Sequence, residues 1–205
     1  MTQISRRRVM QQGALAMLGG SALLRSAYAV DGFVTANTQF GKVRGVDAGG
    51  IKTFRGIPYG ADTSGANRFM PPLSPQPWTT VRDATSFGHS APQRVAAAPR
   101  LALAPRDLPA QGEDCLVLNV QTPAVNDGRA RPVMFWCHGG GFVSGSGSSP
   151  DFDGSNLCRR GDVVVVAVHH RLNALGFTDL AEIGDRKSTR LNSSHGKLSR
   201  MPSSA

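Results

Sequence analysis

Residues 133–142 read Val-Met-Phe-Trp-Cys-His-Gly-Gly-Gly-Phe, and this stretch decides the fold. The apolar run 133–137 shows no polar alternation, which predicts a strand buried on both faces of a sheet. It ends abruptly in His138 and the glycines 139–141. Because glycine has no side chain, backbone N–H groups there can approach a ligand closely. Two such groups aimed at one point would form an oxyanion hole, which stabilises developing negative charge. The plainer alternative is a glycine-rich turn after a core strand.

The neighbouring segments predict an α/β arrangement. Residues 115–120 and 162–168 are further apolar runs, and residues 155–161 suggest a short helix that closes on a glycine. Upstream, the β-rich segments 33–35, 41–46 and 51–57 predict an antiparallel meander. We therefore expect a mixed, mostly parallel sheet preceded by a β meander. The proline-rich connection 58–109 is long enough to serve or cover a site, and its low-complexity part, 96–109, is expected to be disordered.

Residues 1–29 are predicted to be an export signal of the bacterial twin-arginine type. Arginines 6–8 precede a weakly apolar stretch, 13–24, and Ala27-Tyr28-Ala29 supplies a small-x-small cleavage pattern. The apolar stretch is too short and too rich in glycine to be a stable membrane anchor. Cleavage near Ala29 would leave a periplasmic or secreted protein that begins near Val30. An ordinary secretory signal is the alternative.

Residues 185–205 are predicted to be a non-native tail. Apolar periodicity stops at Asp185, and the segment resembles the continuous translation of a short-read sequencing adapter. A genuine disordered basic tail is the alternative. Each end carries four net positive charges, so residues 30–184 keep a net charge of +1 out of the formal +9. The high isoelectric point therefore gives no reason to expect a nucleic-acid partner.

The three cysteines suit neither a disulfide framework nor a metal site, since their number is odd and their spacing fits no metal motif. We expect Cys115, Cys137 and Cys158 to be unpaired. Cys137 lies in the apolar run and is predicted to fill the core. Cys158 is predicted to be a small residue of the short helix.

Six separated motifs resemble the type-B carboxylesterase family. They lie in the family's order, and the likeness runs from about residue 33 to residue 180. The motifs are FRGIPYG (54–60), RFMPP (68–72), EDCLVLNV (113–120), PVMFWCHGGGF (132–142), DGSNL (153–157) and HRLNALGF (170–177). The resemblance implies that residues 30–184 form the N-terminal portion of an α/β-hydrolase fold, truncated before its end. It implies a serine esterase that acts through an acyl-enzyme on small-molecule esters. No cofactor or metal is implied, and the oligomeric state stays open.

The resemblance also assigns roles to residues of the glycine stretch. Gly140 and Gly141 would donate their N–H groups to the oxyanion, Gly139 and His138 would shape the turn, and Phe142 would pack near the acyl pocket. The acidic pair Glu113 and Asp114 would hold loops by hydrogen bonds. Arg55 and Arg171 would be buried partners of carboxylates.

This chain departs from the family pattern at two positions. His169 stands where the family usually has Asn, and we expect a satisfied core histidine there. Cys115 matches a family cysteine that often pairs with an earlier cysteine, which this chain lacks.

The catalytic triad is absent from these 205 residues. No Gly-x-Ser-x-Gly motif occurs, and Ser144, Ser146 and Ser148 have the wrong neighbours for a nucleophile elbow. The serine, its acid and its histidine are therefore expected beyond Gly184. The chain by itself is predicted to lack esterase activity and to be insoluble or unstable, because an apolar strand edge would be left exposed.

Two other classes of protein share parts of this sequence pattern. A catalytically dead relative used for adhesion or binding would keep the same fold. A nucleotide-binding module is disfavoured, because Gly139-x-Gly141-x-x-Ser144 lacks the last glycine of the dinucleotide fingerprint and no P-loop lysine follows.

Overall fold

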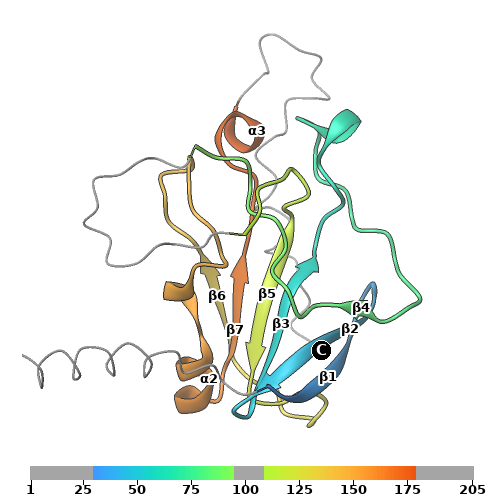
Figure 1. Cartoon of the computed structure of the whole chain (residues 1–205), viewed down its shortest axis with the longest axis vertical. Helices are drawn as coiled ribbons and strands as arrows, with labels where there is room; N and C mark the ends of the chain where they lie inside the picture. The colour runs from blue at the N-terminus through green and yellow to red at the C-terminus, as the bar shows by residue number, and fades with distance from the viewer. Residues whose placement is uncertain (1–29, 95–108, 179–205) are drawn as a thin grey trace, which may run out of the picture.

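The structure, a computed structural model, describes residues 30–94 and 109–178 (Figure 1). The predicted export signal, nearly all of the low-complexity segment and the predicted tail therefore lie outside the described residues.

The described chain is built on one mixed, seven-stranded sheet with the strand order β1-β2-β3-β5-β7-β6, to which β4 adds by pairing with β2. Short helical segments flank it: η1 (Gly65–Asn67), η2 (Pro150–Phe152), α2 (Ser155–Gly161) and α3 (Asn173–Phe177). The strands are β1 (Val30–Thr38), β2 (Gly41–Ala48), β3 (Ile51–Pro58), β4 (Arg82–Asp83), β5 (Val117–Thr122), β6 (Val133–Cys137) and β7 (Val164–Val168). The predicted meander and the three predicted apolar strands are thus all present.

The meander forms where the sequence predicts it because its turns suit tight reversal. Gly49 and Gly50 have φ values of 57° and 77°, and Ala48 pairs with Ile51 across this two-residue turn. Two-residue hairpins require such left-handed backbone, which glycine adopts without a steric penalty. Val43 and Phe54 then point into one core cluster with Ala84, so the meander is anchored by burial as well as by its turns.

β6 and β7 form a parallel pair in continuous register, from Val133 opposite Val164 to Cys137 opposite Val168. In Figure 1 both arrows point the same way, with α2 near their starts and α3 beyond the end of β7. The connection between them ends at Asp162, whose left-handed backbone lets its N–H donate to Cys158 O at 3.1 Å. Cys158 packs against Ile51 and Val165, so α2 is fixed on one face of the sheet.

Parallel pairing is less extensive than the sequence predicts. Among the described strands, only β6 with β7 and β4 with β2 are parallel. β5 runs antiparallel to both of its neighbours, β3 and β7. The sheet is mixed as expected, but this central antiparallel strand and the meander keep the described part mostly antiparallel.

The prediction that β6 is buried on both faces is wrong for the described residues. β6 is the edge strand of the described sheet, and all 5 of its residues are exposed, Val133 to 61% and Trp136 to 48%. Cys137 is likewise exposed and does not fill the core. β7, which has a neighbour on each side, shows the expected burial. A strand is buried on both faces only when other elements cover it, which its own sequence cannot ensure.

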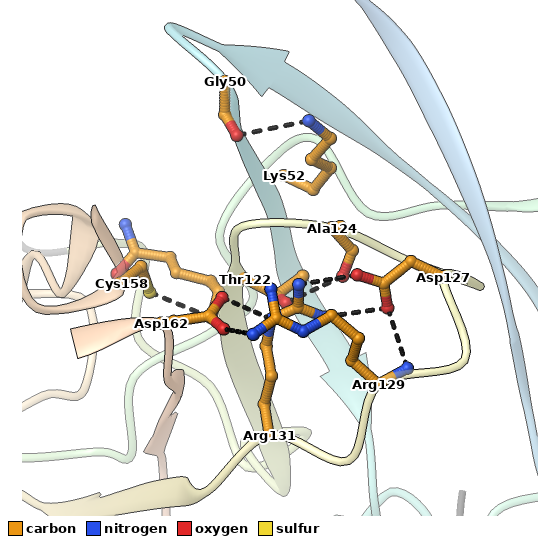
Figure 2. A network of polar contacts seen from close by, with 10 residues as sticks. Gly50, Lys52, Thr122, Ala124, Asp127, Arg129, Arg131, Cys158 and Asp162 are labelled. Atoms are coloured by element: carbon orange, nitrogen blue, oxygen red, sulfur yellow. Dashed lines mark hydrogen bonds and ion pairs between the residues drawn. The ribbon is translucent and has the colours of Figure 1, made fainter. Parts of the chain in front are cut away.

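A polar network fixes the starts of β6 and β7 (Figure 2). Arg131 donates to both oxygens of Asp127, at 2.8 and 2.6 Å, and through Nε to Asp162 Oδ1 at 2.8 Å. Arg129 forms a second ion pair with Asp162. Hydrogen bonds from Arg131 lower the pKa of Asp127 to about 2. Since Asp162 ends α2 and Arg131 precedes β6, the network aligns the two parallel strands at their amino ends.

We predict that Arg131→Met lowers the melting temperature more than Arg129→Met. The Arg131 side chain is 8% exposed and forms ion pairs with two carboxylates, whereas that of Arg129 is 65% exposed and pairs with one. Exposed single ion pairs contribute little to stability, while a hydrogen-bonded bidentate pair contributes more. Scanning calorimetry of the complete gene product carrying each substitution checks this, and equal melting temperatures would contradict the assigned importance of Arg131.

We also predict that the chain self-associates through β6 and that Val133→Lys reduces this association. An exposed apolar edge strand offers unpaired N–H and C=O groups to another chain, and a lysine on the edge blocks such pairing. Leu73→Lys is the matched control, since Leu73 is 58% exposed but lies in a loop and not in an edge strand. Sedimentation velocity should show a shift toward monomer for Val133→Lys only. A monomeric, cooperatively melting parent chain would refute the prediction.

Candidate active site

The two parallel strands deliver their polar continuations to one edge of the sheet. β6 runs into His138 and the glycine turn, and β7 runs into His169 and His170. The next segments also meet there, because Asn173 N, at the start of α3, donates to Phe142 O at 2.9 Å. This is the edge at which open α/β sheets place their ligand sites.

The glycine turn has a backbone that only glycine adopts easily. Gly140 and Gly141 have φ values of 132° and 62°, and Phe142 follows with 65°. A Cβ on Gly140 would collide with the backbone carbonyl of Ser144, so glycine is required there on steric grounds as well. Gly140 O accepts from the N–H groups of Val143 and Ser144, both at 3.2 Å. The turn is therefore closed on its carbonyl side.

The amide side of this turn is open. Within residues 30–94 and 109–178, the N–H groups of Gly140 and Gly141 donate no hydrogen bond. Both residues are exposed, so these N–H groups face solvent and are accessible to a ligand. Chemically, they can receive an oxygen that carries negative charge.

Aromatic side chains pack against one another beside the turn. The His138 and His170 rings meet edge to face, with centroids 4.5 Å apart, and Phe142 packs against Phe177 at 4.7 Å. His138 is 8% exposed, and its desolvation lowers the pKa of the imidazole. Phe142 is 63% exposed, so its place beside an acyl pocket stays a prediction.

His169 is a satisfied core histidine, as predicted. It is 1% exposed, and its Nδ1 lies 3.1 Å from His89 O, so that nitrogen must carry the proton. Nε2 therefore accepts from Ser148 Oγ, 2.7 Å away, while Asn119 Nδ2 donates to the same hydroxyl at 3.1 Å. Burial, which disfavours the charged form, lowers the pKa of His169 to about 4.

This serine–histidine contact could be mistaken for catalytic machinery, because Ser148 also lines a cavity of about 220 Å³. Two features argue against it. The second nitrogen of His169 faces a carbonyl and not a carboxylate, and a base with so low a pKa is a weak proton acceptor. In addition, Ser148 is 4% exposed and its hydroxyl is already engaged on both sides. The pair holds the loop after the glycine turn.

Arg55 and Arg171 differ from expectation: Arg55 is only half-buried, and neither arginine forms an ion pair within the described residues. Arg171 Nη1 donates to Met70 O at 2.9 Å, while its Nε and Nη2 are buried without a partner in that part of the chain. Desolvation lowers the pKa of Arg171. Arg55 donates to Thr85 O at 3.2 Å and lies over the Phe87 ring at 4.9 Å. Desolvation lowers the pKa of Arg55, and the nearby charge of Asp153 opposes this. Spacing alone could not show which carboxylates would reach them.

The acidic pair behaves only partly as expected. Glu113 accepts from Arg68 Nε and Nη2, at 2.7 and 2.5 Å, and thereby joins two loops. Its backbone carbonyl also accepts from Thr63. Asp114, by contrast, is exposed. Cys115, which follows Asp114, is fully buried against Ala91 and Leu172, and its thiol is unpaired.

Sequence reasoning missed the residues that brace the glycine loop from outside. Ser90 Oγ donates to Ser146 Oγ at 2.9 Å, and the Gln93 amide pairs with Gly145. Both come from the long proline-rich connection. Its length was the one available signal, since such connections usually serve a site, but no local pattern marks these two side chains.

The chain combines a mixed sheet, flanking helices and a parallel strand that ends in a His-Gly-Gly-Gly turn. This combination defines the α/β-hydrolase class of fold. The sequence model of the carboxylesterase family matches residues 33–188. The chain belongs to the carboxylesterase family.

Individual relatives agree with this assignment. The chain is 41% identical over 157 residues to the para-nitrobenzyl esterase of Bacillus subtilis, covering 75% of this chain and 31% of that protein. It is 34% identical over 183 residues to mouse neuroligin-2, covering 71% of this chain and 22% of that protein. Among solved structures, an esterase from Clostridium hathewayi aligns with a TM-score of 0.70 at 39% identity, covering 80% of this chain and 33% of that one. The chain thus spans about a third or less of the length of these relatives.

The described residues show neither a metal centre nor a membrane span. They contain no group of three or more His, Cys, Asp or Glu side chains that could hold a metal ion. No helix in that part of the chain is long and apolar enough to cross a bilayer.

We predict that acid destabilises the fold through His169. Its folded pKa of about 4 lies below the ordinary 6.5, so the unfolded chain binds more protons between these values. The contribution is complete above pH 6.5 and is lost as pH falls toward 4, by about 3 kcal/mol. Urea unfolding of the Val133→Lys chain from pH 7 to pH 4.5 measures it. His169→Asn should flatten the profile, and an unchanged slope would contradict the assignment.

Proposed function

We propose that the gene product to which this chain belongs is a carboxylic ester hydrolase that acts through an acyl-enzyme. The amides of Gly140 and Gly141 form its oxyanion hole, and Gly139 and His138 shape the turn. The nucleophilic serine, its histidine and its acid are supplied by sequence beyond Gly184. The chain of 205 residues is inactive by itself.

The single observation that carries this proposal is the pair of free N–H groups on consecutive left-handed glycines at the end of β6. When a serine hydroxyl attacks an ester carbonyl, the carbonyl oxygen gains negative charge as its double bond becomes single. Preorganised N–H donors stabilise that oxygen more than they stabilise the neutral ester. The alcohol then leaves, and water releases the acid from the acyl-enzyme.

Small-molecule esters are the proposed substrates, with aryl and short-acyl esters the first to test. The family relationship and the names of the esterase relatives support this class. The proposed site of action is the periplasm or the medium, on the strength of the paired arginines and the Ala-x-Ala pattern in residues 1–29. Residues 185–205 are proposed to be foreign to the protein, and the absence of a membrane anchor and of a nucleic-acid partner belongs to the same proposal.

Reading the gene past Gly184 is the first experiment. A serine in a Gly-x-Ser-x-Gly context after a further apolar strand would support the esterase, and hydrolysis of para-nitrophenyl acetate by the product would establish it. A frame without a serine or another nucleophile at the elbow would overturn it in favour of a binding or adhesion protein. Neuroligin-2, whose name is not that of an enzyme, shows that the match alone does not decide this.

We predict that Gly140→Ala lowers kcat of the complete gene product by about 10²- to 10³-fold, the cost of losing one oxyanion donor. The added Cβ collides with Ser144 O, so the turn must move and the amides lose their alignment. Steady-state kinetics with para-nitrophenyl acetate measure the loss.

Gly128→Ala is the matched control for this prediction. Gly128 also has a positive φ, 72°, but a Cβ there meets nothing within 4 Å and the residue lies in the loop before β6. That variant should lose some stability and keep its kcat. Equal losses of kcat in both variants would show that the effect is general backbone strain.

A further inference from the structure

Gln93 forms an unusually complete contact with the glycine loop. Its Nε2 donates to Gly145 O at 2.8 Å, and Gly145 N donates to its Oε1 at 2.8 Å. One side-chain amide thus satisfies both backbone groups of a residue 52 positions away in the sequence. Nε2 also donates to Ala91 O at 3.1 Å, so both of its protons are used and the orientation of the amide is fixed.

The segment that carries Gln93 is itself anchored. The Gln93 N–H donates to Gln111 Oε1 at 2.9 Å, and Asn173 Nδ2 donates to Pro92 O at 3.0 Å. Ala91, two residues earlier, is 2% exposed in the cluster with Cys115 and Leu172. The Gln93 side chain therefore extends from a segment that is itself held by packing and hydrogen bonds. A side chain that fixes a loop needs such support.

Gly145 connects the anchored segment of Gln93 to the glycine turn. Its φ is 122°, and a Cβ there would collide with Gly139 O and with the ring of His138. Gly145 therefore lies directly against the residues that precede Gly140. Ser144, its neighbour, lies against the Cα side of Gly140 and donates its N–H to Gly140 O. Moving Gly145 would move the turn on both sides.

We infer that Gln93 is a positioning residue of the oxyanion hole: its amide holds the Gly145 peptide, and through it the direction of the Gly140 and Gly141 N–H groups. Gln93 does not touch the reacting atoms. This inference rests on the proposed esterase function and adds a residue from a distant segment to that site. Misplacement of such donors by about 1 Å can cost two orders of magnitude in rate.

Two substitutions of Gln93 test this positioning role in the complete gene product. Gln93→Glu keeps the shape but presents only acceptors to Gly145 O and Ala91 O at neutral pH, and Gln93→Met keeps the length without polar atoms. Gln121→Glu is the matched control. Gln121 also pins a loop glycine, accepting from Gly154 N at 2.6 Å, but at the α2 end of the same β6–β7 connection. Gln93→Glu and Gln121→Glu each remove two hydrogen bonds donated by Nε2, which for Gln121 go to Asp153 Oδ1 and Ser155 Oγ, so stability alone cannot separate these two variants. Gln93→Met also removes the bond from Gly145 N.

The decisive readout compares transition-state and ground-state binding. For both Gln93 variants we expect kcat to fall about 10- to 100-fold with little change in KM. The inhibition constant of an aryl trifluoromethyl ketone, whose serine adduct places an oxyanion in the hole, should rise in parallel. Hydrogen exchange of residues 139–146 should become faster. Gln121→Glu should change none of these three quantities.

The outcomes separate the two proposals. An active wild type with Gln93 variants of unchanged kcat and unchanged ketone affinity overturns the positioning role and leaves the esterase proposal intact. A complete product that hydrolyses no ester and forms no ketone adduct overturns the proposed function and, with it, any catalytic role of Gln93. A loss shared equally by Gln121→Glu would reduce Gln93 to a general stabilising residue and so also overturn the inference.

Discussion

The parallel pairing of β6 with β7 is the constraint on which the rest of the structure depends. Parallel strands end at the same edge of a sheet, so this pairing brings His138 and the glycine turn beside His169 and His170. An antiparallel arrangement would send one of the two continuations to the opposite edge. The Arg131 network at the amino ends and the Asn173–Phe142 hydrogen bond at the carboxyl ends hold the same alignment from both sides.

The glycine turn consists of conformationally flexible residues, and contacts with neighbouring segments hold it in one conformation. Glycine carries no side chain with which to anchor itself, so a turn of three glycines must be fixed by its surroundings. Here the surroundings are polar and buried: Ser146 bonds to Ser90, Ser148 to His169 and Asn119, and Gly145 to Gln93. Buried polar groups cost free energy unless they are paired, and paired groups specify one arrangement. Rigidity at an oxyanion hole is useful because donors that are already aligned need no reorganisation during the reaction.

Two features of the described residues remain without the partners that their chemistry calls for. β6 exposes apolar side chains on an open edge, and Arg171 buries two guanidinium nitrogens that find no acceptor in the described part of the chain. Arg131 shows the contrast, since all three of its nitrogens are paired with carboxylates. An apolar edge gains stability from a covering element and a buried cation from an acceptor. Both features therefore show where additional contacts would stabilise the fold.

The sequence by itself determined the elements and the turn. Apolar runs and turn residues predicted the meander, β5, β6, β7 and α2 to within three residues at each end, because these signals are local. Six ordered motifs identified the family, and the three glycines marked the turn. The tertiary structure alone decided three further matters: the exposure of β6, the missing carboxylate of Arg171 and the bracing of the loop by Ser90 and Gln93. Each depends on contacts between segments far apart in the chain, and no local pattern of residues encodes which distant atom will arrive at hydrogen-bonding distance.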